Sequence, residues 1–148
     1  MKTTWISDIL EGKHDGQKVE LKGWIKRSRG SNKIRFVVLR DSTGSIQCVA
    51  KKDAVGEECF ENVKSALIES SLIIHGLANP DERADGGYEI IVQDVEIVGP
   101  VNPDTPFPIT ESAMVAADGG ETEFLLDNRH LYLRTTRMTT MLKLRSSV

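Results

Sequence analysis

Lys22–Val49 reads KGWIKRSRGSNKIRFVVLRDSTGSIQCV, and this stretch decides the fold. Its apolar residues come in short runs separated by turn-forming residues, which predicts three strands joined by tight connections. From Lys22 to Arg40 there are seven Lys or Arg residues and no Asp or Glu, in a chain whose formal charge is −3. The positive charge is therefore local to these strands.

Alternation along the second and third strands places particular side chains on one face. Successive residues of a strand point to opposite sides. With Val37 and Leu39 inward, Phe36 points outward, and the same count turns Gln47 outward on the next strand. Residues 41–44 form the turn that makes the two strands neighbours. An exposed ring beside an amide, with arginines at the edge, suits a stacked base, a base edge and a phosphate.

Each of these signals also has a purely structural interpretation. The opposite register would bury Phe36 and turn Arg35 outward. Lysines on an edge strand deter aggregation whatever the strand binds, and an exposed Gln on a strand is ordinary. In the nucleic-acid interpretation, Lys26, Lys33 and Arg35 are the expected phosphate contacts of the basic edge.

Length and composition predict one domain with appendages. A chain of 148 residues with 39% apolar content fills one core of ordinary size. We find no apolar run long enough for a membrane helix and no signal peptide, so we expect a cytoplasmic protein without membrane contact. The two cysteines, Cys48 and Cys59, are expected to be buried thiols, because no second Cys pair or His cluster accompanies them. We therefore predict no metal site. No Ser/His/Asp or paired-carboxylate arrangement is indicated either, so we predict no catalytic residues.

The remaining periodicities complete a pattern of three strands, a helix and two strands. The first strand covers residues 19–26, with a bend or bulge at Gly23. Further elements are a helix over 4–10 capped by Thr3 or Thr4, a helix over 53–70 capped by Asp53, and strands over 71–78 and 88–98. This order predicts a five-stranded OB-fold barrel with a helix between strands three and four, and an α+β sandwich is the alternative.

After the barrel the composition changes. We predict a barrel domain over residues 1–100, a Pro- and Gly-rich hinge linker over 101–123, and the start of a further domain over 124–148. Thr136 opens a helical pattern whose apolar side has no partner in the sequence. We expect the chain to be part of a larger protein, with a native tail docked on the barrel as the alternative.

Several runs resemble one enzyme family: GWIKRSRG, KIRFVVLRDSTGSIQCV, SSLIIHG, GGYEIIVQDVEIV, and above all EFLLDNRHLYLR followed by RMTTMLKLRS. They are similar to the N-terminal part of asparaginyl-tRNA synthetases, which share a class II subgroup with the aspartyl and lysyl enzymes. The resemblance covers essentially the whole chain. It implies that the barrel binds the tRNA anticodon loop and that residues 124–148 begin a truncated α/β catalytic domain.

The resemblance also implies roles for individual residues. Phe36 would stack on the central uridine of the anticodon, while Gln47 and Glu89 would read the edge of that base. Arg27 or Arg29 would contact the anticodon backbone or its first base. The alternation argument supports Phe36 and Gln47 independently, whereas Glu89 rests on the GGYEI motif alone.

The resemblance implies that enzyme activity belongs to the full-length parent, a tRNA ligase that uses ATP and magnesium. This chain alone is expected to be non-catalytic, without a cofactor and monomeric, while the parent forms a homodimer through the missing catalytic domain. A non-discriminating aspartyl-tRNA synthetase is the alternative within the subgroup. From other classes, a general single-strand-binding OB protein and an OB domain used for protein association stay open.

Overall fold

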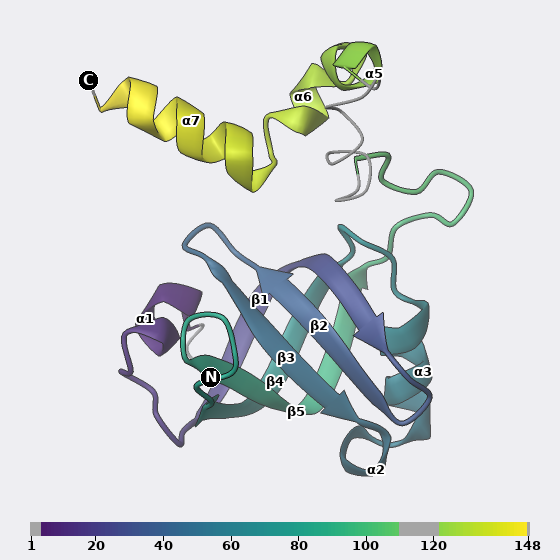
Figure 1. The fold of residues 1–148 in the computed structure, drawn as a ribbon. Coiled ribbons are helices and arrows are strands. Elements are labelled where there is room, and N and C mark those ends of the chain that lie inside the picture. Colours follow the sequence, from purple (N-terminus) through teal and green to yellow (C-terminus); the bar gives the residue numbers. More distant parts are fainter. Residues whose placement is uncertain (1–3, 110–121, 148) are drawn as a thin grey trace. The chain divides into compact units, whose positions relative to one another are not determined.

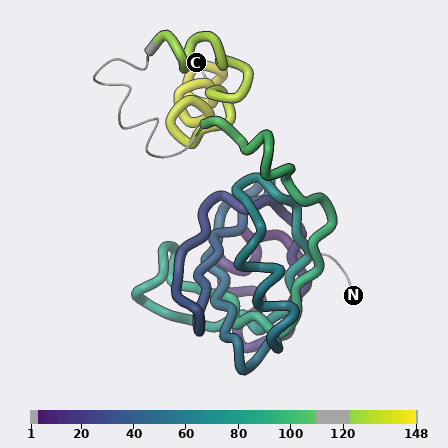
Figure 2. The backbone as a smooth tube through the Cα atoms, turned by 90° about the vertical axis from the view of Figure 1, so that its right-hand side faces the viewer, coloured from purple at the N-terminus to yellow at the C-terminus, as the bar shows by residue number. Residues whose placement is uncertain are grey.

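Five strands close into a barrel in the computed structural model, which describes residues 4–109 and 122–147 (Figure 1). The strands are β1 (Lys18–Gly30), β2 (Ile34–Arg40), β3 (Ser45–Lys51), β4 (Ser71–Pro80) and β5 (Tyr88–Gly99). Their order around the barrel is β1-β2-β3-β5-β4, and Figure 2 shows the backbone winding through it. Only β3 and β5 pair in parallel. The OB-fold prediction is confirmed.

Alternating apolar side chains fill the barrel. The buried set on the strands includes Val19, Leu21, Ile25, Val37, Leu39, Ile46, Cys48, Leu72, Ile74 and Ile90. On β2 the buried residues are Val37 and Leu39, which is the predicted register. Burying one such side chain is worth about 1.5–3 kcal/mol, so a slip by one residue, which would expose the whole set, is strongly disfavoured.

Two helices cover the barrel at different places (Figure 1): α1 (Ile6–Leu10) and α3 (Glu57–Ser65). The first helix is not capped by Thr4. Thr3 lies outside the described residues, and the N-cap position is Trp5, which makes no side-chain cap bond. The Asp41 carboxylate accepts a hydrogen bond from the Ile6 amide at 2.9 Å instead. The cap therefore comes from the β2–β3 turn, which a local sequence rule does not reveal.

The single helix predicted over residues 53–70 is wrong. The structure has α2 (Lys52–Val55) and α3, separated by Gly56 at a φ of +83°. Left-handed backbone of this kind ends a helix and is readily adopted by glycine. Lys51 is the N-cap of α2, and Asp53 lies in its first turn.

The chain divides into two compact units, Met1–Pro106 and Phe107–Val148. The second unit contains α5 (Thr122–Asp127), α6 (Arg129–Tyr132) and α7 (Thr136–Ser146). Thr135 caps α7 by accepting a hydrogen bond from the Met138 amide at 3.4 Å, so the predicted helix at Thr136 is confirmed. Within the predicted linker, residues 110–121 lie outside the described part. No helix within residues 4–109 or 122–147 is long and apolar enough to cross a membrane.

Candidate nucleic-acid interface

Two rows of side chains run across all five strands on the outer face of the barrel. The polar row consists of Arg27, Val38, Gln47, Glu89 and Asn79, which are cross-strand partners on β1, β2, β3, β5 and β4. The apolar row beside it consists of Arg29, Phe36, Val49, Ile91 and Leu77. Neighbouring strands lie about 4.8 Å apart, so partners within a row are in reach of one another.

A bulge in β1 aims both arginines at this face. The pairing of β1 with β2 shifts by one residue between Ile25 and Arg27, which leaves Lys26 without a ladder partner. Ile25 is fully buried, and plain alternation from it would turn Arg27 and Arg29 inward. The bulge turns both outward instead. The irregularity predicted at Gly23 thus lies further along the strand.

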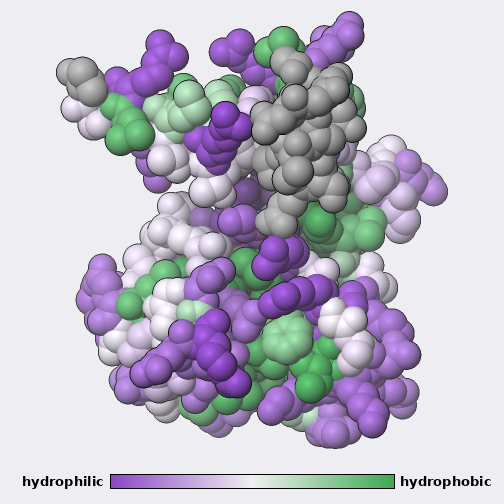
Figure 3. Space-filling view, viewed as in Figure 1, coloured by the Kyte–Doolittle hydropathy of each residue, from purple (hydrophilic) through white to green (hydrophobic). Residues whose placement is uncertain are grey.

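Phe36 forms the centre of the apolar row. The ring is half-buried, and the guanidinium carbon of Arg29 lies 5.6 Å from its centroid. Its cross-strand neighbour Val49 is only 6% exposed although it lies on the outer face. Val49 therefore lies beside the ring on the neighbouring strand, and the Arg29 guanidinium lies over it. A cation–π contact of this kind is worth about 0.5–1 kcal/mol at an exposed site. Figure 3 shows hydrophobic surface on the barrel bordered by hydrophilic side chains.

Glu89 occupies the middle of the polar row. Because β3 and β5 are parallel, Glu89 is the direct partner of Gln47. The Gln47 Nε2 donates to Glu89 Oε2 at 3.5 Å, and the Asn79 Nδ2 donates to Glu89 Oε1 at 3.5 Å. The three side chains therefore form one line of hydrogen-bonding groups beside Phe36. The structure places Phe36, Gln47 and Glu89 on one outer face. Alternation predicted this placement for Phe36 and Gln47, whereas Glu89 came from the resemblance alone.

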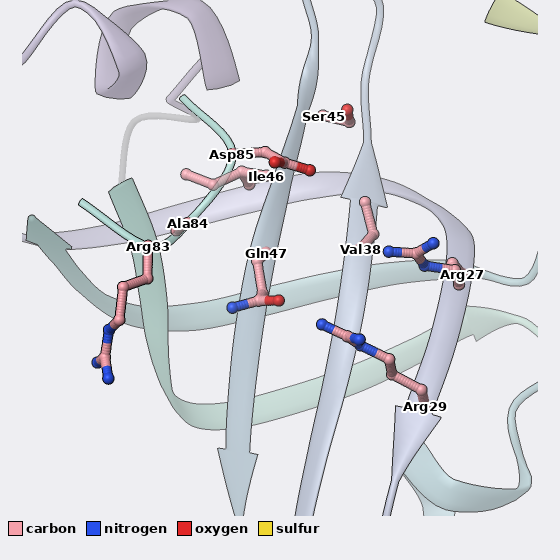
Figure 4. Close-up of a pocket in the computed structure, with 9 residues that line it drawn as sticks. All are labelled: Arg27, Arg29, Val38, Ser45, Ile46, Gln47, Arg83, Ala84 and Asp85. Carbon is pink, nitrogen blue, oxygen red and sulfur yellow. The ribbon is translucent and has the colours of Figure 1, made fainter. Parts of the chain in front are cut away.

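A pocket of about 100 Å³ opens between these strands and the β4–β5 loop. Its lining consists of Arg27, Arg29, Val38, Ser45, Ile46, Gln47, Arg83, Ala84 and Asp85 (Figure 4). In this view the Gln47 amide lies between Arg29 and Arg83. Arg83 donates to both carboxylate oxygens of Asp81, at 3.0 and 2.9 Å, and lowers the pKa of Asp81 to about 2. The pocket wall thus carries guanidinium groups, while the chain as a whole is acidic.

The three other predicted phosphate contacts, Lys26, Lys33 and Arg35, lie in different surroundings. Arg35 is a correction to this set: it shares the inward side of β2 with Val37, and its Nη2 donates to the Lys64 carbonyl at 3.2 Å. Its guanidinium holds the end of α3 rather than joining the Phe36 face. Lys33 is exposed in the β1–β2 connection and Lys26 is partly exposed at the bulge. Their phosphate contacts stay predictions.

Sequence reasoning missed two residues of this face. Asn79 lies one residue beyond the strand predicted over 71–78, yet it is the cross-strand partner of Glu89. A period-two count from Leu77 would have placed it outward. Arg83 lies in a loop without periodicity, and no local signal indicates that this loop returns to Gln47.

A closed five-stranded barrel with an aromatic ring, an amide and guanidinium groups on its outer face defines a nucleic-acid-binding module of the OB class. The chain belongs to the family described as OB-fold nucleic acid binding domain, whose model matches residues 19–98.

The particular relatives are tRNA ligases. The chain is 41% identical to the asparagine–tRNA ligase of Thermoplasma acidophilum over 97% of its own length and 31% of that protein's length. The asparaginyl-tRNA synthetase of Pyrococcus horikoshii, solved with asparaginyl-adenylate, matches with a TM-score of 0.82 and 36% identity over 99% of this chain and 32% of that one. An aspartyl-tRNA synthetase from Entamoeba histolytica, at 19% identity and a TM-score of 0.78, shares the fold. The chain therefore spans about a third of these relatives.

Proposed function

We propose that this chain is the anticodon-binding part of an asparagine–tRNA ligase. The observation that carries the proposal is the cluster of Phe36, Gln47 and Glu89 from three different strands, with Arg27 and Arg29 turned toward it. Similarity of about 40% to asparagine–tRNA ligases along nearly the whole chain supports the same assignment.

The geometry suggests how an anticodon base is bound. The central uridine stacks on Phe36, whose half-buried ring lies on the outer face of the barrel. Gln47 turns its NH2 toward Glu89, so its carbonyl oxygen is available as an acceptor. The N3–H of uracil donates to such an acceptor, whereas the N3 of cytosine is itself an acceptor and is repelled. Arg27 and Arg29 neutralise the adjoining phosphates.

The whole enzyme joins asparagine to tRNA through an asparaginyl adenylate, using ATP and magnesium, and acts in the cytoplasm. Residues 4–109 and 122–147 contain no group of three or more His, Cys, Asp or Glu side chains that could surround a metal ion. Residues 124–148 begin the catalytic domain after a linker over 101–123. The parent is a homodimer through that domain, and this chain alone is a monomer.

A hairpin titration tests the proposal. An anticodon stem-loop with the sequence GUU is expected to bind about tenfold better than the GCU hairpin, the scale of one good base contact. Phe36→Ala is expected to weaken both complexes by about tenfold, because stacking is worth about 1–3 kcal/mol per base. Equal binding of both hairpins, unaffected by Phe36→Ala, would instead favour the protein-association alternative.

The general single-strand-binding alternative predicts a different result, namely equal affinity for the hairpin and for an unstructured oligonucleotide. Such proteins carry several exposed aromatics along one groove. Here the exposed Trp5 and Trp24 line a separate groove with Ile73 and Val98, and none of these four lines the pocket around Gln47. The non-discriminating aspartyl alternative predicts that the GUU hairpin and the aspartate hairpin, GUC, bind equally well.

A further inference from the structure

Asn79 lies at the end of β4 and has no part in the function proposed so far. It is the direct cross-strand partner of Glu89, just as Gln47 is on the other side. Glu89 is therefore flanked by two amide side chains from two neighbouring strands, all on the outer face. Asn79 and Glu89 are both half-buried.

The two amides bind different oxygens of the same carboxylate. Gln47 Nε2 approaches Glu89 Oε2, and Asn79 Nδ2 approaches Glu89 Oε1, each at 3.5 Å. Separations at this upper limit contribute little free energy individually. Together the two hydrogen bonds fix the orientation of the Glu89 carboxylate, because it cannot rotate without losing one of its two donors.

Glu89 also interacts electrostatically with a positive group outside the polar row. Its charge acts on Arg83 of the β4–β5 loop, where it adds to the larger effect of Asp81 in raising the pKa of Arg83. Without a donor on the Asn79 side, the Glu89 carboxylate is free to rotate away from Gln47. Gln47 would then lose the acceptor that fixes its amide, and either end of the amide would face the bound base.

We propose that Asn79 is a positioning residue for base discrimination: it holds Glu89 against Gln47 so that the polar row presents acceptors to uridine. The inference rests on the proposed anticodon-binding function and deepens it. Asn79 acts through Glu89 and does not touch the base. Removing its donor therefore lowers the preference for uridine over cytidine more than it lowers affinity as such.

The test compares Asn79→Asp and Asn79→Ala with the wild-type chain, using the GUU and GCU hairpins. Asn79→Asp keeps the shape and removes the donor. Asn62→Asp is the matched control, because Asn62 is exposed on α3 and makes the same charge change away from the face. We expect the ratio of the two dissociation constants to fall from about tenfold to about twofold in both Asn79 variants and to stay unchanged in Asn62→Asp.

Two failures are distinguishable. If the wild-type chain binds both hairpins equally, the proposed function fails and the inference fails with it. If the wild-type chain prefers uridine and both Asn79 variants keep the full ratio, the function stands and the positioning role is refuted. If Asn79→Asp lowers the melting midpoint, the test is decided by Asn79→Ala, which adds no charge beside Glu89.

Discussion

Removing the two arginines that the β1 bulge aims outward should weaken RNA binding in a salt-dependent way. Arg27 and Arg29 both line the pocket around Gln47. Each phosphate contact on a single strand contributes about 0.7 to the slope of log K against log salt. The double variant Arg27→Gln with Arg29→Gln should therefore lower the slope by about 1.4 and, at about 0.1 M salt, weaken hairpin binding about 25-fold.

The assay is an anisotropy titration of the GUU hairpin over a series of salt concentrations. The control is Arg137→Gln with Arg145→Gln, two exposed residues of α7 whose loss changes the net charge equally. The control should keep the wild-type slope. If the Arg27 and Arg29 variant keeps that slope too, the two guanidinium groups make no phosphate contacts and the reasoning about the bulge is refuted.

Three further predictions concern the barrel itself. Gly23→Ala should cost about 1–3 kcal/mol in urea unfolding, because a Cβ there would lie 2.3 Å from the Arg40 carbonyl oxygen; a wild-type midpoint would contradict this close approach. Asp41→Ala should cost about 1 kcal/mol through the lost cap of α1, visible as faster amide exchange in that helix. Burial raises the pKa of the Cys48 thiol to about 12, so a thiol reagent at pH 8 should label Cys59 first and Cys48 only on unfolding, as peptide mapping would show.

Short-range patterns predicted much of this barrel. Alternation on β2 and β3 placed Phe36 and Gln47 outward, because period two is enforced wherever one face fills a core. The same count places Arg35 inward beside Val37, and its assignment to the basic edge ignored that consequence. Alternation alone therefore predicts that Arg35 points inward, although its positive charge favours an exposed position.

Other features depend on contacts between distant segments. Glu89 joins Gln47 only because β5 closes the barrel in parallel against β3, and no local pattern specifies that pairing. The bulge at Lys26 carries no Gly or Pro signal; it is set by the requirement that Ile25 stay buried while the following residues remain paired with β2. The cap of α1 by Asp41 likewise joins residues 35 positions apart.

The most direct test of the central claim is a nitrogen-15 NMR titration of the chain with the GUU hairpin. The side-chain amides of Gln47 and Asn79 report on the polar row, and the indole N–H groups of Trp5 and Trp24 report on the separate groove. The account predicts that the two amide signals shift on binding while the two indole signals stay in place. Shifts of the indole signals with unmoved amides would contradict it and would place the RNA on the other surface.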